Sequence, residues 1–293
     1  MSLSLAGICY FHPKDMKASL SRHQSHRPST LRAVLRLSGL LVAGLLWLTS
    51  ALPIAIASLL GRRARFRLIT FLTAPFCRTV AFFIGMRIST EGSPDENTRV
   101  FVANHVSWLD ILLVGSAVSG VFVSRHDLKN WPGIGIFARL AGTVFIDRTS
   151  LKSAVESSSA IVERAGEDIR VAFFPEGKAS EGDDVLPFKP FLFGAIVEKG
   201  FAVQPVTLMY THIGKTPVAV EDRDLLYWYS SDQDFLAHAW QILKLPSVQA
   251  RAVFRPSQSP PENPDRNSLR AFVEDLREST RTGIPVWDSN EAD

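Results

Sequence analysis

The stretch "FVANHVSWLD", residues 101–110, reads as the end of a buried strand followed by the start of a helix. Two polar side chains, His105 and Asp110, interrupt its apolar run. On a regular helix, residues five positions apart are separated by roughly 140° around the axis and do not face each other. The two side chains can therefore meet only if His105 lies at a strand-to-helix corner and Asp110 lies in the first turns of the helix.

At such a corner, Asp110 can accept a hydrogen bond from one imidazole nitrogen and leave the other nitrogen free to take a proton. General-base assistance of this kind typically contributes about 10²- to 10⁴-fold in rate. A His-x4-Asp spacing also arises by chance, as a pair that only stabilises the fold. This stretch alone leaves both interpretations open.

Around this corner, short apolar runs alternate with helical patterns. We expect strands at 99–104, 120–124, 143–147, 169–174, 202–210 and 249–254, and helices at 106–118, 150–165 and 190–199. A final amphipathic helix carries an apolar stripe at Leu269, Phe272, Val273 and Leu276. Strands that alternate with helices predict an α/β layered domain with a mostly parallel or mixed sheet flanked by helices.

Two further polar stretches follow predicted strands. "FFPEGKAS" (173–180) contains Glu176 and Gly177, where a carboxylate and backbone N–H groups can meet a polar ligand or simply form a turn. "GTVFIDR" (142–148) ends in Arg148, which can hold a phosphate in bidentate fashion or pair with a neighbouring carboxylate. Ligands of open α/β sheets gather at the carboxyl ends of the strands, so all three stretches belong to one candidate site.

An uncharged run of residues, Leu37 to Leu60, precedes this domain. As a helix it would reach roughly 36 Å, enough to cross a hydrocarbon core of about 30 Å. Arginines flank it on both sides, and a second apolar run contains Arg78, so we expect a pair of helices that dip into one leaflet with the arginines near anionic headgroups. Pro53 is the expected kink. Spanning and one-leaflet attachment both stay open.

The composition sets the remaining bounds. The chain has 293 residues and a formal net charge of only +3, which speaks against a nucleic-acid partner. Two cysteines, Cys9 and Cys77, form neither a disulfide framework nor a metal-ligand spacing, and fit a reducing compartment. We predict a polar flexible tail at 1–32, a membrane-associated helical segment at 33–86, the α/β domain at 87–282 and a C-terminal tail at 283–293.

Four stretches, "NHVSWLD", "GTVFIDR", "FPEGKAS" and "AVQPVTL" (202–208), resemble in this order the conserved blocks of glycerolipid acyltransferases of the lysophosphatidate type. The resemblance implies transfer of a fatty acyl group from acyl-CoA or acyl-carrier protein to a lysolipid hydroxyl, with no metal or other cofactor. It implies that His105 deprotonates the hydroxyl while Asp110 fixes the imidazole. The hydroxyl then attacks the thioester directly, without an acyl-enzyme.

The resemblance also implies an acceptor site lined by Phe174, Pro175, Glu176 and Gly177, with Arg148 and Lys178 near the headgroup. The third block of the family usually reads Glu-Gly-Thr-Arg-Ser, whereas this chain has Lys178 and Ala179 at the third and fourth positions. The missing arginine weakens the expectation of a phosphate-bearing acceptor, because lysine binds phosphate only as a point charge.

The resemblance as a whole implies 1-acylglycerol-3-phosphate as the acceptor, in phospholipid biosynthesis, and the missing arginine makes lyso-ornithine lipid the alternative. A thioesterase, in which water replaces the lipid hydroxyl, and a non-catalytic lipid-binding protein of the same fold are the rival functions. Membrane lipids are further expected partners. The expected location is the cell inner membrane, with the catalytic domain on the cytoplasmic face.

Overall fold

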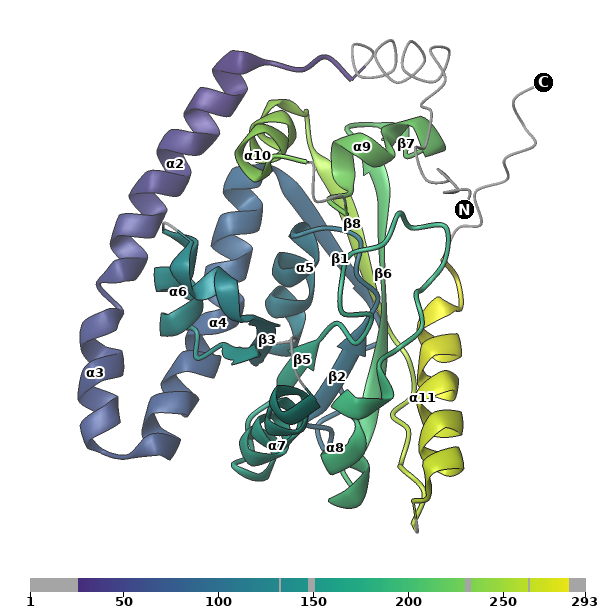
Figure 1. Ribbon diagram of the computed structural model, residues 1–293. Helices are drawn as coiled ribbons and strands as arrows, with labels where there is room; N and C mark the ends of the chain where they lie inside the picture. The colour runs from purple at the N-terminus through teal and green to yellow at the C-terminus, as the bar shows by residue number, and fades with distance from the viewer. Residues whose placement is uncertain (1–25, 132, 147–150, 230–232, 263, 285–293) are drawn as a thin grey trace, which may run out of the picture.

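The computed structural model describes residues 26–284, except 132, 147–150, 230–232 and 263. Most of the predicted N-terminal and C-terminal tails lies outside these residues. The described chain forms one eight-stranded sheet with helices on both faces, and three apolar helices extend along one side of it (Figure 1).

The sheet is mixed, as the sequence predicts. Its strand order is β1-β8-β6-β2-β5-β3-β4, and the short β7 pairs with β6. The bounds are β1 Met86–Glu91, β2 Val100–Ala103, β3 Val121–Arg125, β4 Val144–Ile146, β5 Val171–Phe173, β6 Val203–Ile213, β7 Thr216–Pro217 and β8 Val248–Phe254. The five strands from β6 to β4 are parallel, whereas β8 runs antiparallel to β6 and β1 runs parallel to β8.

All six predicted strands are confirmed, and β1 and β7 are additional. β1 is an edge strand in which only Met86 is fully buried, so its sequence lacks the apolar run that reveals the central strands. The central strands are covered on both faces. In β2, Phe101 and Ala103 belong to one apolar cluster while Val100 and Val102 belong to the other. This explains why these strands are continuous apolar runs rather than alternating ones.

Helices fill both layers. One face is covered by α4 Arg62–Ile84, α5 Leu109–Val118 and α10 Phe235–Lys244, and the other by α7 Leu151–Gly166, α8 Gly194–Glu198 and α11 Arg266–Arg281. The shorter helices are η1 His126–Asn130, α6 Ile134–Leu140, η2 Pro190–Leu192, η3 Val220–Asp222 and α9 Arg223–Leu226. The sequence did not reveal α6, α9 and α10, and the predicted helix at 190–199 is divided into η2 and α8.

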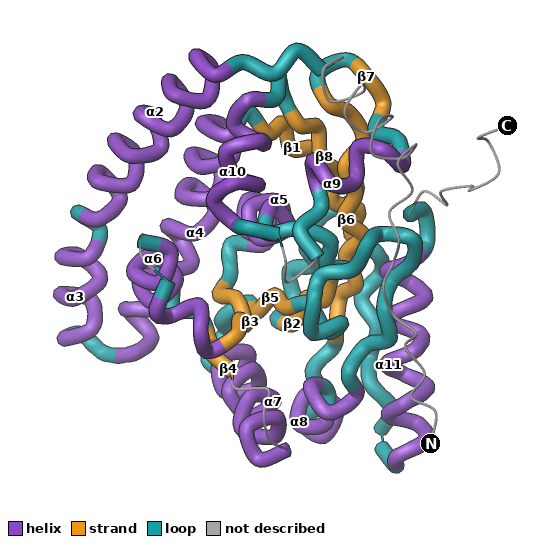
Figure 2. Tube along the Cα trace, turned by 45° about the horizontal axis from the view of Figure 1, so that its top comes forward, coloured by secondary structure: helices purple, strands orange, loops and turns teal. Residues whose placement is uncertain are grey.

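The apolar N-terminal run forms two helices, α2 Thr30–Leu48 and α3 Ala51–Leu59, which lie outside α4 (Figure 2). The break at Thr49–Ser50 precedes Pro53, whose ring would clash with the carbonyl of residue 49 in a continuous helix. Thr30–Leu59 and Arg62–Ile84 are each long and apolar enough to cross a membrane, and only 17% and 33% of their most apolar windows are buried.

Two arginines attach the start of α2 to the α/β domain. Arg36 donates to the backbone carbonyls of Leu243, Leu245 and Pro246, at 2.7–3.1 Å. Arg32 donates to the Lys244 carbonyl at 2.7 Å. These carbonyls belong to the last turn of α10 and the residues after it, where positive charge is stabilising. Arg32 and Arg36 therefore bind the α/β domain, a contact that the sequence did not predict.

Gly85 provides the space for this attachment. It ends α4 in the left-handed conformation, with φ of 81°, and a Cβ there would overlap the Arg36 guanidinium. We expect Gly85→Ala to lower the free energy of unfolding by about 1–2 kcal/mol for the left-handed backbone alone. Displacement of Arg36 adds a further loss on the order of 1 kcal/mol, since three hydrogen bonds are disturbed.

Gly200→Ala is the matched control for this prediction, because Gly200 has a φ of 70° and open space around its Cβ position. Chemical unfolding of both variants measures the difference. Equal losses for Gly85→Ala and Gly200→Ala would show that the Arg36 attachment does not contribute to stability.

Candidate active site

The structure brings His105 and Asp110 together at the corner between β2 and α5. Residues 106–108 turn the chain before α5 begins at Leu109, three residues later than the sequence predicts. The His105 Nδ1 and Asp110 Oδ2 atoms lie 2.8 Å apart. The Asp110 side chain is fully buried, whereas the His105 side chain is 21% exposed. The imidazole thus points Nδ1 inward and keeps Nε2 on the side away from the carboxylate.

The Asp110 carboxylate also holds the corner itself. Its Oδ2 atom accepts the backbone N–H groups of Val106 and Ser107, at 2.7 and 2.8 Å. Its Oδ1 atom accepts the hydroxyl of Tyr210 at 2.6 Å. Four hydrogen bonds therefore surround a buried carboxylate, and this is the compensation that a buried charge requires.

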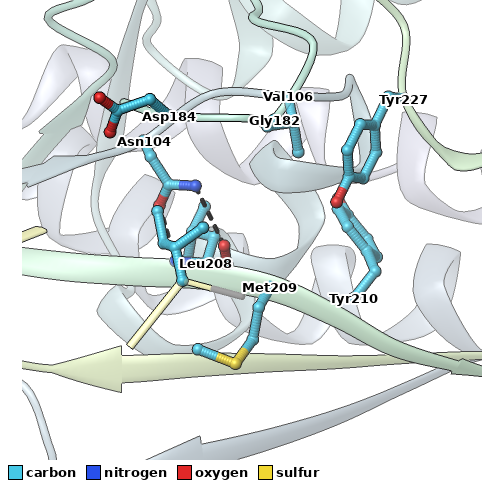
Figure 3. A pocket seen from close by; sticks show the side chains of 9 residues that line it. Asn104, Val106, Gly182, Asp184, Leu208, Met209, Tyr210 and Tyr227 are labelled. Atoms are coloured by element: carbon cyan, nitrogen blue, oxygen red, sulfur yellow. Dashed lines mark hydrogen bonds between the residues drawn. The ribbon is translucent and has the colours of Figure 1, made fainter. Parts of the chain in front are cut away.

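Tyr210 comes from β6, the strand beside β2. Burial, and then the charge of Asp110, raise the pKa of Tyr210 well above its usual value, so the phenol stays protonated and donates. Figure 3 shows Tyr227 pointing toward Tyr210, with ring centroids 6.0 Å apart. A cavity of about 10 Å³ beside them is also lined by Asn104 and Val106. It has room for about one water molecule.

The loop after β5 packs against this corner because β5 and β2 are parallel neighbours, with Val100 opposite Val171 and Val102 opposite Phe173. Phe174 stacks on His105, with ring centroids 4.2 Å apart and an interplanar angle of 13°. Ser180 donates its backbone N–H to the His105 carbonyl at 2.8 Å. This loop therefore contacts both the ring and the backbone of the histidine.

Glu176 bridges the loop and the corner. Its Oε1 atom accepts the His105 backbone N–H at 2.6 Å, and its Oε2 atom accepts the Leu186 backbone N–H at 2.8 Å. The residue is only 2% exposed. Burial raises the pKa of Glu176 to about 8, and the two backbone donors act in the opposite direction. Both oxygens of this carboxyl group face the protein interior.

The other predicted site residues are distributed around this core. Pro175 is buried, and its carbonyl accepts the Lys189 N–H at 2.9 Å. Gly177 adopts a φ of 82°, which favours glycine, and Lys178 is exposed beside it. Arg148 lies outside the described residues. The structure thus gathers 174–178 at the corner that holds the His–Asp pair.

Sequence reasoning missed two residues of this network. Tyr210 lies on a buried strand, and a buried phenol usually needs a hydrogen-bond partner, which was the available signal. Asn104 directly precedes the histidine, and its side-chain amide bonds the Leu208 backbone at both N–H and carbonyl, at 2.7 and 3.0 Å. Asn104 therefore fixes the end of β2 against β6.

Among the described residues, no group of three or more His, Cys, Asp and Glu side chains is arranged to hold a metal ion. Ser107, in the turn between the two residues, is fully buried, and its hydroxyl accepts the Leu109 N–H at 3.4 Å. The chemistry that the described residues offer is therefore a partly exposed imidazole oriented by a buried carboxylate.

The part of the chain that holds this histidine matches a family of known proteins. The Acyltransferase family model matches residues 86–209, from β1 into β6. The chain belongs to this acyltransferase family, as the four sequence blocks predict.

Curated relatives carry two different names. The chain is 34% identical to a lyso-ornithine lipid O-acyltransferase of Rhodobacter capsulatus, over 69% of this chain and 73% of that protein. It is 33% identical to a protein of the same name from Brucella abortus, over 68% and 77%. It is 30% identical to a 1-acyl-sn-glycerol-3-phosphate acyltransferase of Neisseria meningitidis, over 67% and 74%.

A solved structure shares the fold. The crystal structure of the 1-acyl-sn-glycerophosphate acyltransferase PlsC from Thermotoga maritima aligns with a TM-score of 0.59, covering 89% of this chain and 95% of that one. The two sequences are 19% identical. This likeness confirms the predicted mixed α/β sheet flanked by helices.

Tyr210→Phe tests the hydrogen bond to Asp110. The substitution removes one donor from a buried carboxylate and preserves the ring, so we expect a loss of about 1–3 kcal/mol in the free energy of unfolding. The kcat for acyl transfer is expected to fall by about tenfold as the carboxylate becomes less fixed. Urea unfolding and initial rates provide the two measurements.

Tyr227→Phe is the control, since its ring packs beside Tyr210 and no hydrogen bond from its hydroxyl to Asp110 is present among the described contacts. We expect its kcat to stay within about twofold of wild type. A Tyr210→Phe enzyme that matches Tyr227→Phe in both stability and rate would contradict a role for the Tyr210–Asp110 bond.

Proposed function

We propose that this chain transfers a fatty acyl group from a thioester donor, acyl-CoA or acyl-carrier protein, to the hydroxyl of a lysolipid, with His105 as the general base. The observation that carries the proposal is the 2.8 Å contact from His105 Nδ1 to a fully buried Asp110, which leaves a partly exposed imidazole at the sheet edge. The family membership supports the acyl-transfer reaction.

The proposed reaction needs no covalent enzyme intermediate. His105 Nδ1–H donates to Asp110, so Nε2 accepts the proton of the acceptor hydroxyl as its oxygen bonds to the thioester carbonyl carbon. The resulting tetrahedral species collapses, the carbon–sulfur bond breaks, and the leaving thiolate takes the proton from the imidazolium. Phe174 keeps the imidazole plane fixed throughout, because the two rings are stacked.

The proposed acceptor site is the loop that follows β5. Phe174, Pro175 and Gly177 shape its surface beside His105, while Lys178 is exposed and Arg148 is proposed to lie near the headgroup. Glu176 contributes to this site by holding the loop, since both of its oxygens accept backbone N–H groups.

For the acceptor itself, we propose lyso-ornithine lipid ahead of 1-acylglycerol-3-phosphate. Ala179 stands where the family's third block usually has arginine, so the guanidinium fork that would bind a phosphate in bidentate fashion is missing there. Relatives at 34%, 33% and 33% identity carry the lyso-ornithine name, against 30% for the Neisseria meningitidis phosphate enzyme. The phosphate acceptor remains the second candidate because that relative is nearly as similar.

We also propose attachment to the inner membrane, with the catalytic domain on the cytoplasmic face. Large apolar side chains on the outer surfaces of α2, α3 and α4 are 52–86% exposed, among them Leu31, Leu35, Leu41, Leu45, Leu46, Leu52, Ile56, Leu59, Leu60, Phe71 and Phe82. Exposed apolar side chains on helices of this length support an interaction with lipid. Arg63 and Arg67 are exposed in the first two turns of α4, and positive charge there supports a position near cytoplasmic headgroups.

His105→Ala tests the mechanism. We expect kcat to fall by about 10²- to 10⁴-fold, because the general base is lost. The protein should stay folded and bound to membranes. His126→Ala is the control, since it removes an exposed histidine from η1. Initial rates with purified protein and vesicle flotation provide the measurements, and wild-type turnover in His105→Ala would defeat the proposed mechanism.

A second experiment identifies the acceptor. Membranes containing the protein receive a labelled acyl donor together with lyso-ornithine lipid and 1-acylglycerol-3-phosphate, and mass spectrometry identifies the acylated product. We expect lyso-ornithine lipid to be preferred by about tenfold or more in kcat/KM. Ala179→Arg should shift this ratio toward the phosphate acceptor. Release of free fatty acid instead of a diacyl lipid would indicate a thioesterase, and a preference for the phosphate acceptor would reverse the assignment.

A further inference from the structure

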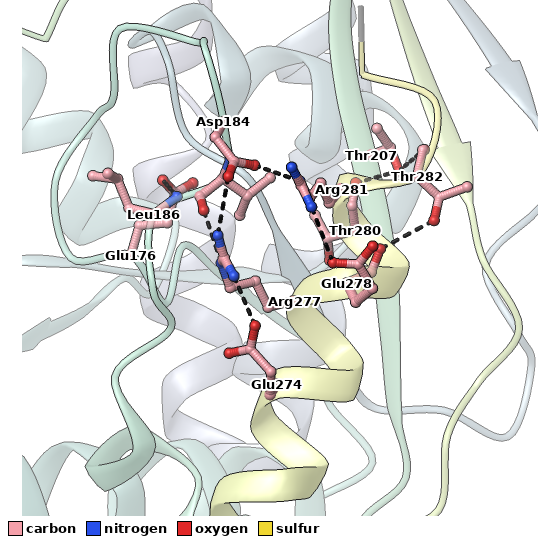
Figure 4. A network of polar contacts seen from close by, with 11 residues as sticks. Glu176, Asp184, Leu186, Thr207, Glu274, Arg277, Glu278, Thr280, Arg281 and Thr282 are labelled. Atoms are coloured by element: carbon pink, nitrogen blue, oxygen red, sulfur yellow. Dashed lines mark hydrogen bonds and ion pairs between the residues drawn. The ribbon is translucent and has the colours of Figure 1, made fainter. Parts of the chain in front are cut away.

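The C-terminal helix α11 contacts the loop that holds Glu176, although α11 lies outside the residues 86–209 that match the family. The loop from Glu181 to Leu186 connects the predicted acceptor site to this helix. Figure 4 shows Arg277 and Arg281 of α11 pointing toward Asp184, with Glu176 and Leu186 beside them. A helix remote in sequence from the four blocks is therefore in contact with the active-site loop.

Arg277 makes the more extensive contact with this loop. Its Nε atom donates to the Val185 carbonyl at 2.8 Å, and its Nη2 atom donates to the Asp184 carboxylate at 3.2 Å. Its Nη1 atom donates to Glu274 on the same helix at 2.7 Å, which orients the guanidinium. The Arg277 side chain is 17% exposed, so solvent screens these contacts only in part. Arg277 thus fixes both the side chain and the backbone of the two residues before Leu186.

Leu186 continues this path toward the histidine. Its backbone N–H donates to Glu176 Oε2 at 2.8 Å, and Glu176 Oε1 accepts the His105 N–H at 2.6 Å. Each link is a hydrogen bond to backbone or to a buried carboxyl group, so displacement of residues 184–186 changes the position of Glu176. The His105 backbone is the last member of the path.

We propose that Arg277 is a positioning residue for His105, acting through the backbone of residues 185 and 186 and through Glu176. The proposal rests on the function proposed above, in which His105 is the general base. In this proposal α11 contributes to catalysis without contacting the substrate.

Electrostatics adds a measurable consequence. The groups that face Glu176 among the described residues are His105 at the corner, Asp110 from α5 and Arg277 from α11. Burial raises the pKa of Glu176, Asp110 raises it further, and Arg277 lowers it. Only the ionised carboxylate accepts both N–H groups well, because a protonated carboxyl turns one oxygen into a donor. Loss of the Arg277 charge should therefore move the onset of activity to higher pH.

The test compares Arg277→Gln with Arg270→Gln in the full-length protein in detergent micelles. Arg270 is exposed on the same helix, so its substitution removes the same charge without touching the loop. We expect Arg277→Gln to lower kcat by about 10- to 100-fold near neutral pH. The pH at which its kcat rises should lie about half a pH unit or more above the corresponding pH of the wild-type enzyme. The KM for the acyl donor should stay unchanged, and Arg270→Gln should match wild type in both measurements.

A double-mutant cycle separates positioning from general destabilisation. In a Glu176→Gln background the path is already interrupted, so Arg277→Gln should cause little further loss and its effect on the pH profile should disappear. Additive losses, or an Arg277→Gln enzyme with wild-type kcat and pH profile, would overturn the proposal.

Arg277→Lys provides the test if Arg277→Gln does not fold. It keeps the positive charge and gives up the planar fork, so the pH profile should stay near wild type while kcat falls to an intermediate value. An Arg277→Lys enzyme with full kcat would overturn the proposal. His105→Ala in the same assay distinguishes failure of the proposed function from failure of the Arg277 inference. Retained activity in His105→Ala defeats the proposed function. An inactive His105→Ala enzyme together with a normal Arg277→Gln enzyme defeats only the inference about Arg277.

Discussion

The site depends above all on one buried carboxylate. Asp110 is fully excluded from solvent and accepts four hydrogen bonds, from an imidazole, a phenol and two backbone N–H groups. A charge in this position needs such donors, because burying a carboxylate without hydrogen-bond partners is costly. The turn at 106–108, the rotamer of His105 and the place of Tyr210 are therefore consequences of one requirement. The orientation of the His105 imidazole comes from satisfying that carboxylate within the fold.

The parallel order of the sheet supplies the remaining parts. β2 lies between β5 and β6, so the segments that follow these strands meet at one edge. The loop after β5 provides Phe174, which stacks on the imidazole, and Glu176, which accepts the His105 N–H. Strand β6 provides the Tyr210 hydroxyl that donates to Asp110. Strand pairing thus brings together blocks that are 30 to 100 residues apart in the chain. The loops that follow these strands begin beside one another, so short loops are enough to form the site.

The sequence predicts the elements whose signal is local. The six strands found in advance are buried runs, and the final helix has a clear apolar stripe at Leu269, Phe272, Val273 and Leu276. The edge strand β1 and the short helix α6 are absent from the prediction because their stability comes from neighbours rather than from their own pattern. Helix geometry predicts where His105 must lie if it is to meet Asp110, whereas Tyr210 and Arg277 are linked to the site only by tertiary contacts. The contacts of Arg32 and Arg36 in the first turns of α2 were missed for the same reason, since their carbonyl partners lie some 210 residues away.

The network also separates the residues that hold His105 from the residues expected to meet the headgroup. The groups around His105 are held by hydrogen bonds to backbone atoms or to buried carboxyl groups, and a substitution among them leaves an unsatisfied buried partner. The positions expected to meet the headgroup differ in this respect, because Lys178 is exposed and Ala179 is only half-buried. A change at these two positions costs little stability and leaves the His–Asp pair in place. We therefore expect acceptor preference to vary at this edge independently of the His105–Asp110 pair, which is consistent with relatives of similar identity that carry different acceptor names.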